Sequence, residues 1–233
     1  YQNNFVCSLN LFDTMVKYKV KHLIFSSSAA VYGMPDLPKI TEETACLPIN
    51  PYGETKWMSE KVLRDYRIAY GLISTSLRYF NAAGADPTGK IRSFKKKENN
   101  LIPLVLNAIL KNKPLTIYGT DYQTPDGTCI RDYIHVADLS SAHLLALEKQ
   151  LTGKASDCYN LGNGKGYSVK EVIAAAERVT GHPVPTIKGP RRPGDPPILL
   201  ADASKAIREL GWIPKYPEID KMIHDAWKAR TTT

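Results

Sequence analysis

The chain has 233 residues, of which 43% are apolar and 23% are charged, a composition that is ordinary for a soluble globular protein. That length can bury a full core as one large domain or two small ones. The formal net charge is +8, no apolar run approaches the roughly 20 residues of a membrane helix, and no signal peptide is visible. We therefore expect no membrane partner.

The first part of the chain alternates predicted helices and strands. The predicted elements are a helix over 3–19, a strand over 22–27, a turn-rich loop over 35–48, a helix over 51–70 and a strand over 73–80. Pro51 in the first turn and Gly71 just past the end delimit the long helix. Its expected apolar side carries Met58, Val62, Tyr66 and Ala69. This alternation is typical of part of a parallel sheet.

After Asn81 the pattern changes to a smaller mixed α/β region. It contains predicted helices over 101–110, 137–149, 169–180, 203–210 and 218–229, a strand over 115–118, and an extended Pro-rich stretch over 183–197 with room for one short strand. Ser168 and Glu171 have the spacing of a capping box. We place the domain boundary near Asn81, which gives domains over 1–81 and 82–233.

Two features suggest ligands that we do not expect. The basic run over 92–97 is followed at once by Glu98 and no nucleic-acid module accompanies it, so a solvated loop is the better interpretation. The glycines of residues 161–166 (LGNGKG) do not have the spacing of a phosphate-binding G-x-G-x-x-G, so we expect a tight strand-to-helix turn there. We predict no nucleic-acid partner.

The cysteines Cys7, Cys46, Cys129 and Cys158 are widely spaced, without a Cys-x-x-Cys pair. This spacing argues against a zinc site or a disulfide scaffold, and we expect no metal. It favours a reducing, cytoplasmic setting.

The stretch 50–56 (NPYGETK) places Tyr52 and Lys56 one helical turn apart, on the same face. A free phenol has a pKa near ~10, so it is a poor base at neutral pH. An ammonium about 4 Å away is worth at most about 4 kcal/mol, enough to bring that pKa toward about 7. The spacing therefore predicts that Lys56 lowers the pKa of Tyr52 and makes it a usable acid or base. On a surface helix the same spacing is often mere amphipathic decoration.

Upstream of this pair, residues 25–33 (FSSSAAVYG) end an apolar strand in hydroxyl groups that could hold a substrate oxygen. The Ser, Tyr and Lys set resembles the short-chain dehydrogenase/reductase superfamily. That set resembles the extended, nucleotide-sugar branch of the superfamily, and five further blocks narrow the resemblance to the UDP-glucose 4-epimerases: LRYFNAAGA (77–85), NNLIP (99–103), YGTDY (118–122), DGT (126–128) and RDYIHV (131–136). The likeness runs from about Tyr1 to about Trp227.

The resemblance implies an incomplete doubly wound, Rossmann-like parallel sheet followed by a second, smaller mixed α/β substrate domain. In that family a Gly-rich turn binds the cofactor pyrophosphate at a helix N-terminus near the start of the chain. No such turn opens this sequence, so we expect an N-terminally truncated NAD-binding domain over 1–81 and a nucleotide-sugar-binding domain over 82–233. The family also implies a homodimer for the full-length protein.

The implied activity is NAD-dependent epimerisation of UDP-glucose and UDP-galactose at C4 through a transient 4-keto sugar, in galactose metabolism. Tyr52 would be the acid/base, Ser28 would hydrogen-bond the sugar 4-oxygen and Lys56 would hold the nicotinamide ribose. Further residues carried over for NAD are Asn3, Tyr79 and Phe80. Those carried over for the UDP-sugar are Asn81, Asn100, Leu101, Thr116, Tyr118, Arg131, Arg192, Asp195 and Leu199.

Several alternatives stay open. Arg131 could simply pair with a nearby carboxylate such as Asp132 or Asp126. Leu199 occupies a position that helps to decide whether N-acetylated UDP-sugars fit, and leucine is intermediate in size there. A 4,6-dehydratase or a decarboxylase of the same family is the nearest rival, although Ala29 and Ala30 follow Ser28 where a dehydratase needs carboxylates. A catalytically inactive UDP-sugar-binding fragment is the rival from another class.

Overall fold

The computed structural model describes residues 1–91, 98–153 and 158–231, so the basic run over 92–97 lies outside the described residues. The chain divides into two compact units. Unit 1 consists of residues 1–80, 140–161 and 201–213, and unit 2 consists of residues 81–139, 162–200 and 214–233. The sequence predicts two contiguous domains, but residues 140–161 and 201–213 return to unit 1, where the first of these segments supplies a strand of its sheet.

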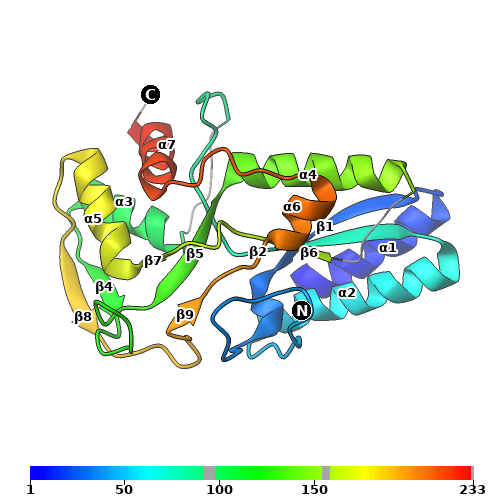
Figure 1. The fold of residues 1–233 in the computed structure, drawn as a ribbon, viewed down its shortest axis with the longest axis horizontal. Coiled ribbons are helices and arrows are strands. Elements are labelled where there is room, and N and C mark those ends of the chain that lie inside the picture. The colour runs from blue at the N-terminus through cyan, green and yellow to red at the C-terminus, as the bar shows by residue number, and fades with distance from the viewer. Residues whose placement is uncertain (92–97, 154–157, 232–233) are drawn as a thin grey trace. The chain divides into compact units, whose positions relative to one another are not determined.

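Unit 1 is built on a parallel sheet with strand order β1-β2-β6 (Figure 1). Its strands are β1 (His22–Ser28), β2 (Ile73–Tyr79) and β6 (Cys158–Leu161). Its helices are the π-helical turn η1 (Gln2–Val6), α1 (Cys7–Lys17), the 3-10 turn η2 (Ala29–Tyr32), α2 (Pro51–Tyr70), the later part of α4 (Val136–Leu151), and α6 (Ser204–Leu210). β1 and β2 pair from His22 opposite Ile73 to Ser28 opposite Tyr79, so their carboxyl ends lie at one edge of the sheet.

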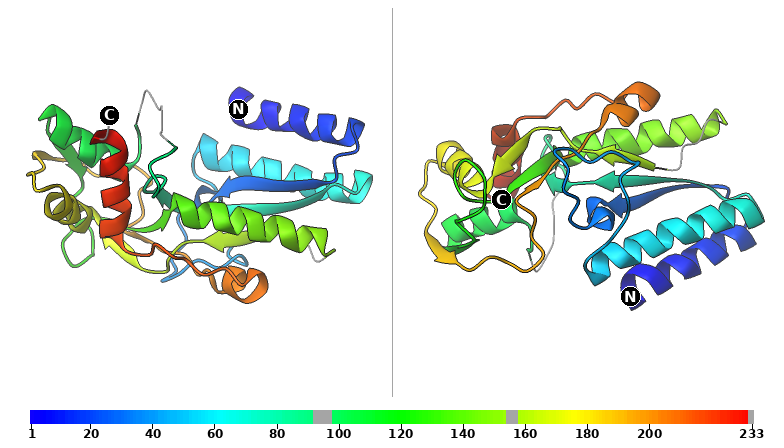
Figure 2. Two further views of the ribbon diagram at one scale, coloured as in Figure 1. Left: turned by 90° about the horizontal axis from the view of Figure 1, so that it is seen from above. Right: turned by 60° about the horizontal axis from the view of Figure 1, so that its bottom comes forward.

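Helices cover both faces of this sheet: α1 and α2 lie on one side and α4 on the other (Figure 2). On the first face, Phe12 of α1 packs edge-on against Phe25 of β1, with ring centroids 6.2 Å apart. On the second face, the Gln150 amide of α4 donates to the Leu23 carbonyl at 3.0 Å and to Thr75 at 2.9 Å. This arrangement confirms the expected Rossmann-like α/β fold.

Helix α2 spans Pro51–Tyr70, as the capping residues predicted, and Val62 and Tyr66 of its expected apolar side pack partly buried against the core. Ala69 is exposed, whereas the buried side chains include Leu63 and the polar Thr55, Ser59 and Glu60. A polar face can be buried here because each polar group has a partner, such as the Thr55 carbonyl for the Ser59 hydroxyl at 2.9 Å.

Unit 2 contains a small mixed sheet and a separate two-stranded sheet. The mixed sheet consists of β3 (Asn81–Ala83), β5 (Ile130–His135), β7 (Gly166–Ser168) and β9 (Ile198–Leu199), with β5 antiparallel to β7 and parallel to β3 and β9. The parallel pair is β4 (Leu115–Tyr118) with β8 (Thr186–Gly189). The helices are α3 (Leu101–Lys111), α5 (Val169–Thr180), α7 (Ile219–Thr231) and the start of α4.

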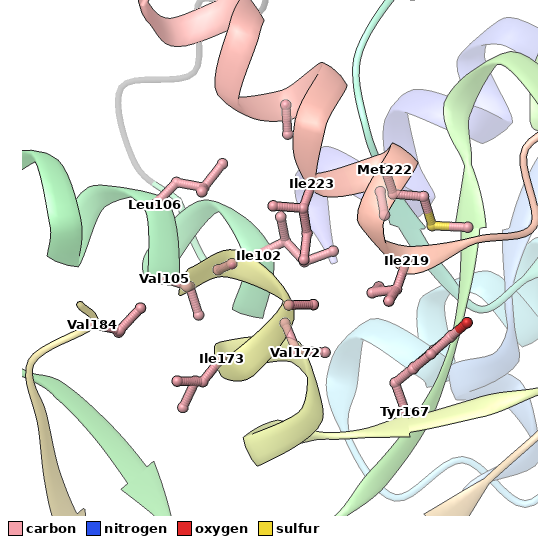
Figure 3. Close-up of a cluster of buried hydrophobic side chains, with 14 of the residues drawn as sticks. Ile102, Val105, Leu106, Tyr167, Val172, Ile173, Val184, Ile219, Met222 and Ile223 are labelled. Carbon is pink, nitrogen blue, oxygen red and sulfur yellow. The ribbon is translucent and has the colours of Figure 1, made fainter. Parts of the chain in front are cut away.

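The core of unit 2 lies where α3, α5 and α7 face one another (Figure 3). Val105 of α3, Val172 of α5 and Ile223 of α7 are each fully buried there. Helix α5 begins at the expected capping box, in which Ser168 accepts from the Glu171 amide at 3.0 Å and the Glu171 carboxylate accepts from the Ser168 amide at 2.7 Å. The start and the end of α5 therefore agree with the bounds predicted from the sequence.

The glycine-rich segment after β6 leads into strand β7 rather than a helix, so the expected strand-to-helix turn was wrong. Its backbone amides do bind an anionic group, but that group is the protein's own carboxylate. The amides of Asn163 and Gly164 donate to the Asp132 carboxylate at 2.8 and 2.9 Å.

In the part of the chain that the structure describes, no helix is long and apolar enough to span a bilayer.

Candidate functional site

The start of α2 is held in place by its N-cap and by a close backbone contact. The Asn50 side chain accepts from the Gly53 amide at 2.8 Å, and Pro51 occupies the first turn. A Cβ built on Gly53 would lie 2.4 Å from the Ala30 carbonyl oxygen. Because only glycine allows this approach, the first turn of α2 lies directly on η2, which follows β1.

This packing brings the three expected catalytic residues together. Ser28 ends β1 and accepts from the Ala30 amide at 3.2 Å, and its side chain lies close enough to the Tyr52 phenol to lower the pKa of that group. The Lys56 ammonium, one turn along α2, donates to the Ser26 carbonyl at 2.9 Å. Ser28, Tyr52 and Lys56 thus share one small region of unit 1.

The electrostatics of Tyr52 differ from the sequence-based expectation. Partial burial raises the pKa of the Tyr52 phenol, the hydrogen bond from Ser28 lowers it by less, and nearby Tyr79 raises it further. The Lys56 ammonium lies over the Tyr52 ring, 5.9 Å from the centroid, and donates to the Ser26 carbonyl, and the pKa of Tyr52 is raised overall. Burial also lowers the pKa of Lys56. In the structure Tyr52 is therefore a neutral phenol at neutral pH, 46% exposed.

The other residues expected to contact the cofactor lie at the ends of unit 1 elements. Tyr79 ends β2 directly opposite Ser28 in the sheet register, and Phe80 after it is buried. Asn3 is exposed in η1 and donates to Asn4 at 3.2 Å. It is Asn4 that reaches α2, through Thr55 at 3.4 Å.

The polar groups at the start of α2 fit a nicotinamide ribose. A lysine ammonium has three donor hydrogens, and the Ser26 carbonyl occupies one of them in Lys56. The Tyr52 hydroxyl is part of a half-exposed side chain on the same helical face. Two donors of Lys56 and the phenol of Tyr52 are thus available to a vicinal diol, the group that a ribose presents.

In unit 2, Arg131 and Asp195 form an ion pair that the sequence did not predict. The Arg131 guanidinium binds the Asp195 carboxylate, and it also donates to the Pro196 carbonyl at 2.6 Å. Leu199, in β9, lies opposite Arg131 in register. The carboxylate considered as an alternative partner at Asp132 is instead held by backbone amides.

A second group of expected residues gathers on β4 and the loop after β8. The guanidinium carbon of Arg192 lies 4.1 Å from the centroid of the Tyr118 ring, a cation–π distance. Tyr118 is 37% exposed, and Thr116 lies two residues before it on the same side of the strand. An exposed ring beside a cation is a suitable platform for a base next to a phosphate.

The remaining expected residues occupy strand and helix ends in unit 2. The Asn81 side-chain amide donates to the Asp132 carbonyl at 2.8 Å and so ties β3 to β5. Asn100 is the N-cap of α3 and makes no side-chain capping bond, and Leu101 packs partly against the core. A helix N-terminus with an exposed amide side chain favours an anionic ligand.

The structure also shows a buried polar network that the sequence analysis missed. Glu60 accepts from the Ser27 hydroxyl at 2.5 Å and from Arg78 at 2.5 and 3.0 Å. Arg78 also donates to the Tyr32 hydroxyl at 2.9 Å, and that hydroxyl donates to Asn160 at 2.7 Å. The sequence does contain a signal for this network. Glu60 follows Lys56 by four residues, as Lys56 follows Tyr52, so the three side chains lie along one face of the helix.

The chain is similar in sequence to a known protein family and to curated proteins of about one and a half times its length. Residues 1–162 match the model of the NAD-dependent epimerase/dehydratase family. The UDP-glucose 4-epimerase of Halalkalibacterium halodurans is 50% identical over 228 residues, which are 97% of this chain and 68% of that protein. The chain thus spans about two thirds of the length of such curated relatives.

The chain is also similar to solved structures of UDP-glucose 4-epimerases. The crystal structure of UDP-glucose 4-epimerase from Brucella ovis in complex with NAD has a TM-score of 0.94 and 44% identity, and the match covers 97% of this chain and 70% of that one. The enzyme from Bifidobacterium longum, in complex with NAD+ and UDP, has a TM-score of 0.87 and 43% identity, with 96% and 68% covered.

Proposed function

The chain belongs to the NAD-dependent epimerase/dehydratase family, and on that premise we propose that it interconverts UDP-glucose and UDP-galactose at C4 of the sugar. The observation that carries this proposal is the joining of Ser28, Tyr52 and Lys56 where β1 ends and α2 begins. A hydroxyl, a phenol and an ammonium at one place suit the oxidation of a sugar alcohol and the reduction of the ketone that results.

In the proposed reaction Tyr52 exchanges a proton with the sugar 4-hydroxyl, and Ser28 hydrogen-bonds the same oxygen. When bound, the nicotinamide cofactor supplies a reversible hydride acceptor for C4. In the oxidation half-reaction the Tyr52 phenolate takes the proton of the sugar 4-hydroxyl, and the contact with Ser28 favours the phenolate form. In the reduction half-reaction the phenol, which the raised pKa keeps protonated at neutral pH, returns that proton to the sugar oxygen. Lys56 holds the ribose diol with its remaining donors.

We propose that unit 2 binds the UDP group of the substrate. Tyr118 and Arg192 would hold the base and a phosphate, with Thr116 beside them. Arg131 and Asp195 would bind phosphate and ribose. Asn81, Asn100 and Leu101 would face the diphosphate, where the α3 N-terminus adds a favourable dipole. Leu199 would border the sugar at the position that selects for or against an N-acetyl group.

The strongest competing reaction is dehydration of the sugar, which needs an acid and a base close to C5 and C6. Ala29 and Ala30 follow Ser28 and form η2, so the positions next to the serine carry methyl groups. A methyl group cannot transfer a proton. This favours epimerisation over 4,6-dehydration.

Tyr52→Phe tests the proposal. With NAD added, we expect the variant to lose 10²- to 10⁴-fold in kcat, the usual contribution of a general acid/base. Unfolding should change little because only a half-exposed hydroxyl is removed. The products of UDP-galactose turnover are identified by sugar NMR.

Tyr70→Phe is the matched control, since Tyr70 is an exposed tyrosine in the last turn of the same helix. It should retain the full rate. Near-full activity of Tyr52→Phe would refute the assignment, and a product lacking the 6-hydroxyl would replace epimerase by dehydratase. UDP binding without any turnover in the unmodified protein would favour an inactive sugar-nucleotide-binding fragment.

Two further parts of the proposal concern the setting of the enzyme. We propose a cytoplasmic location, which is supported by the unpaired thiols of Cys7, Cys46, Cys129 and Cys158. We also propose a homodimer, for which exposed Leu11 on α1 and Ile68 on α2 offer apolar contact surface.

A further inference from the structure

Helix α2 meets the end of β1 through two contacts of the proposed catalytic residues. The Ser28 side chain lies beside the Tyr52 phenol, whose pKa it lowers, and the Lys56 ammonium donates to the Ser26 carbonyl at 2.9 Å. Both groups belong to the first two turns of the helix, and Tyr52 is 46% exposed. The Asn50 cap and the close approach of Gly53 to Ala30 also hold this first turn, but neither involves a residue of β1.

One turn further along the same face, Glu60 contacts the serine that lies between these two. The Ser27 hydroxyl donates to Glu60 Oε1 at 2.5 Å, and Arg78 of β2 donates to the two carboxylate oxygens at 3.0 and 2.5 Å. Ser27 is 0% exposed, Glu60 5% and Arg78 4%. This is the best-shielded contact between the helix and the end of the strand.

A contact of this kind resists displacement. If α2 slid or rotated against β1, the buried Glu60 would lose its hydroxyl and guanidinium partners, and an unpaired buried carboxylate is strongly unfavourable. Because a helix rises 1.5 Å per residue, Glu60 lies about 12 Å along the axis from Tyr52. It therefore acts as an anchor two turns behind the reacting group and does not touch it.

We propose that Glu60 is a positioning residue: its bond with Ser27 sets the register of α2 against the end of β1 and so holds Tyr52 against Ser28. The inference rests on the proposed function, in which Tyr52 is the acid/base. It extends the pattern of serine, tyrosine and lysine to a fourth residue, Glu60, and to its partner Ser27.

Ser27→Ala tests this proposal, because it removes the bond to Glu60 and leaves the Glu60–Arg78 ion pair intact. Ser59→Ala is the matched control: Ser59 lies on the same helix, is also 0% exposed, and donates at 2.9 Å to the Thr55 carbonyl. With NAD present we expect Ser27→Ala to lower kcat about tenfold and to keep KM within twofold. Ser59→Ala should keep both within twofold.

A second measurement does not depend on turnover. In protein labelled with ¹³C-tyrosine, the resonance of Tyr52 is assigned by its absence from Tyr52→Phe, and its titration is followed with pH. Since both burial and the contact with Ser28 set the pKa of Tyr52, a loosened register should shift the midpoint of that titration away from the parent value in Ser27→Ala. The midpoint should stay in place in Ser59→Ala.

The two readouts separate the two proposals. An unchanged Tyr52 midpoint in Ser27→Ala would overturn the positioning role, whatever the rate does. A midpoint that moves equally in Ser59→Ala would also overturn it, because any buried hydroxyl would then have the same effect. If the unmodified protein does not epimerise UDP-sugars, the proposed function fails, and the titration still decides whether Glu60 positions Tyr52.

Discussion

His135 shows at the residue scale how burial sets a protonation state. The ring is fully buried, its Nδ1 accepts from the Ala137 amide at 3.0 Å, and its Nε2 lies 3.2 Å from the Asp225 carboxylate. Only the neutral ring with a proton on Nε2 satisfies both contacts. Burial lowers the pKa of His135 below 6.5, and the charge of Asp225 only partly offsets this.

This lowered pKa predicts a loss of stability in mild acid. Below about pH 6.5 histidine is protonated in the unfolded chain, whereas His135 stays neutral in the folded protein. The free energy of unfolding should therefore fall as pH falls, by at most about 1.4 kcal/mol per pH unit. His135→Gln should flatten this dependence between about pH 6.5 and 5. The measurement is urea unfolding at a series of pH values.

His182→Gln is the control, because His182 is an exposed histidine of the same unit. It should keep the slope of the parent protein. A slope that persists in His135→Gln would mean that another group causes it.

At the element scale, α2 shows which features local sequence can predict. Its bounds were predicted because Asn50, Pro51 and Gly71 are start and stop signals that act within a turn of the helix. The burial of Glu60 was not predicted, because its partners Ser27 and Arg78 lie on two strands outside the helix. The short strands β7 and β9 escaped prediction for the same reason: pairing with β5, rather than their own residues, makes them strands.

The site shows the same limit. The family pattern brought Ser28, Tyr52 and Lys56 together, and the structure joins them. The family pattern did not predict that Lys56 would donate to the Ser26 carbonyl. It also did not predict that Arg131 would pair with Asp195, 64 positions away. Such partners depend on tertiary packing, which residue spacing does not contain.

Gly53→Ala tests the packing of α2 on η2. Alanine favours helix over glycine by about 1 kcal/mol, but its Cβ would lie 2.4 Å from the Ala30 carbonyl oxygen. We expect the first turn of α2 to shift and kcat to fall at least tenfold, although helix propensity rises. Steady-state kinetics with UDP-galactose and NAD measure this.

Gly71→Ala serves as comparison. Gly71 ends the same helix at φ 70° with open space around it, so alanine there adds backbone strain and no steric contact. It should lower stability by about 1 kcal/mol and leave kcat within twofold. Equal rates in Gly53→Ala and the parent protein would contradict the proposed packing constraint.

At the scale of the whole molecule, the expected site residues separate by unit. Those assigned to catalysis and cofactor lie in unit 1, and those assigned to UDP lie in unit 2, apart from Ser28. The two functions should therefore be separable by substitution. Each unit also has its own hydrophobic core, built around Phe12 in one and Val105 in the other.

Arg192→Ala is expected to weaken UDP binding about tenfold, the loss of one charge-assisted contact, and to leave the titration of Tyr52 unchanged. Tyr52→Phe should bind UDP like the parent protein. Calorimetric titration with UDP measures both. Arg178→Ala, which removes an exposed arginine paired with Asp220 elsewhere in unit 2, is the control. Equal UDP affinity in Arg192→Ala and Arg178→Ala would remove Arg192 from the proposed substrate site.

The strand order of unit 1 has a consequence for biosynthesis. β2 lies between β1 and β6, yet β6 follows it in the chain by about eighty residues. At about 5–20 residues per second a ribosome needs roughly 4–16 s to supply that stretch. During this interval one side of β2 has exposed peptide groups without their final partner, which is the situation that attracts chaperones and promotes association of nascent chains.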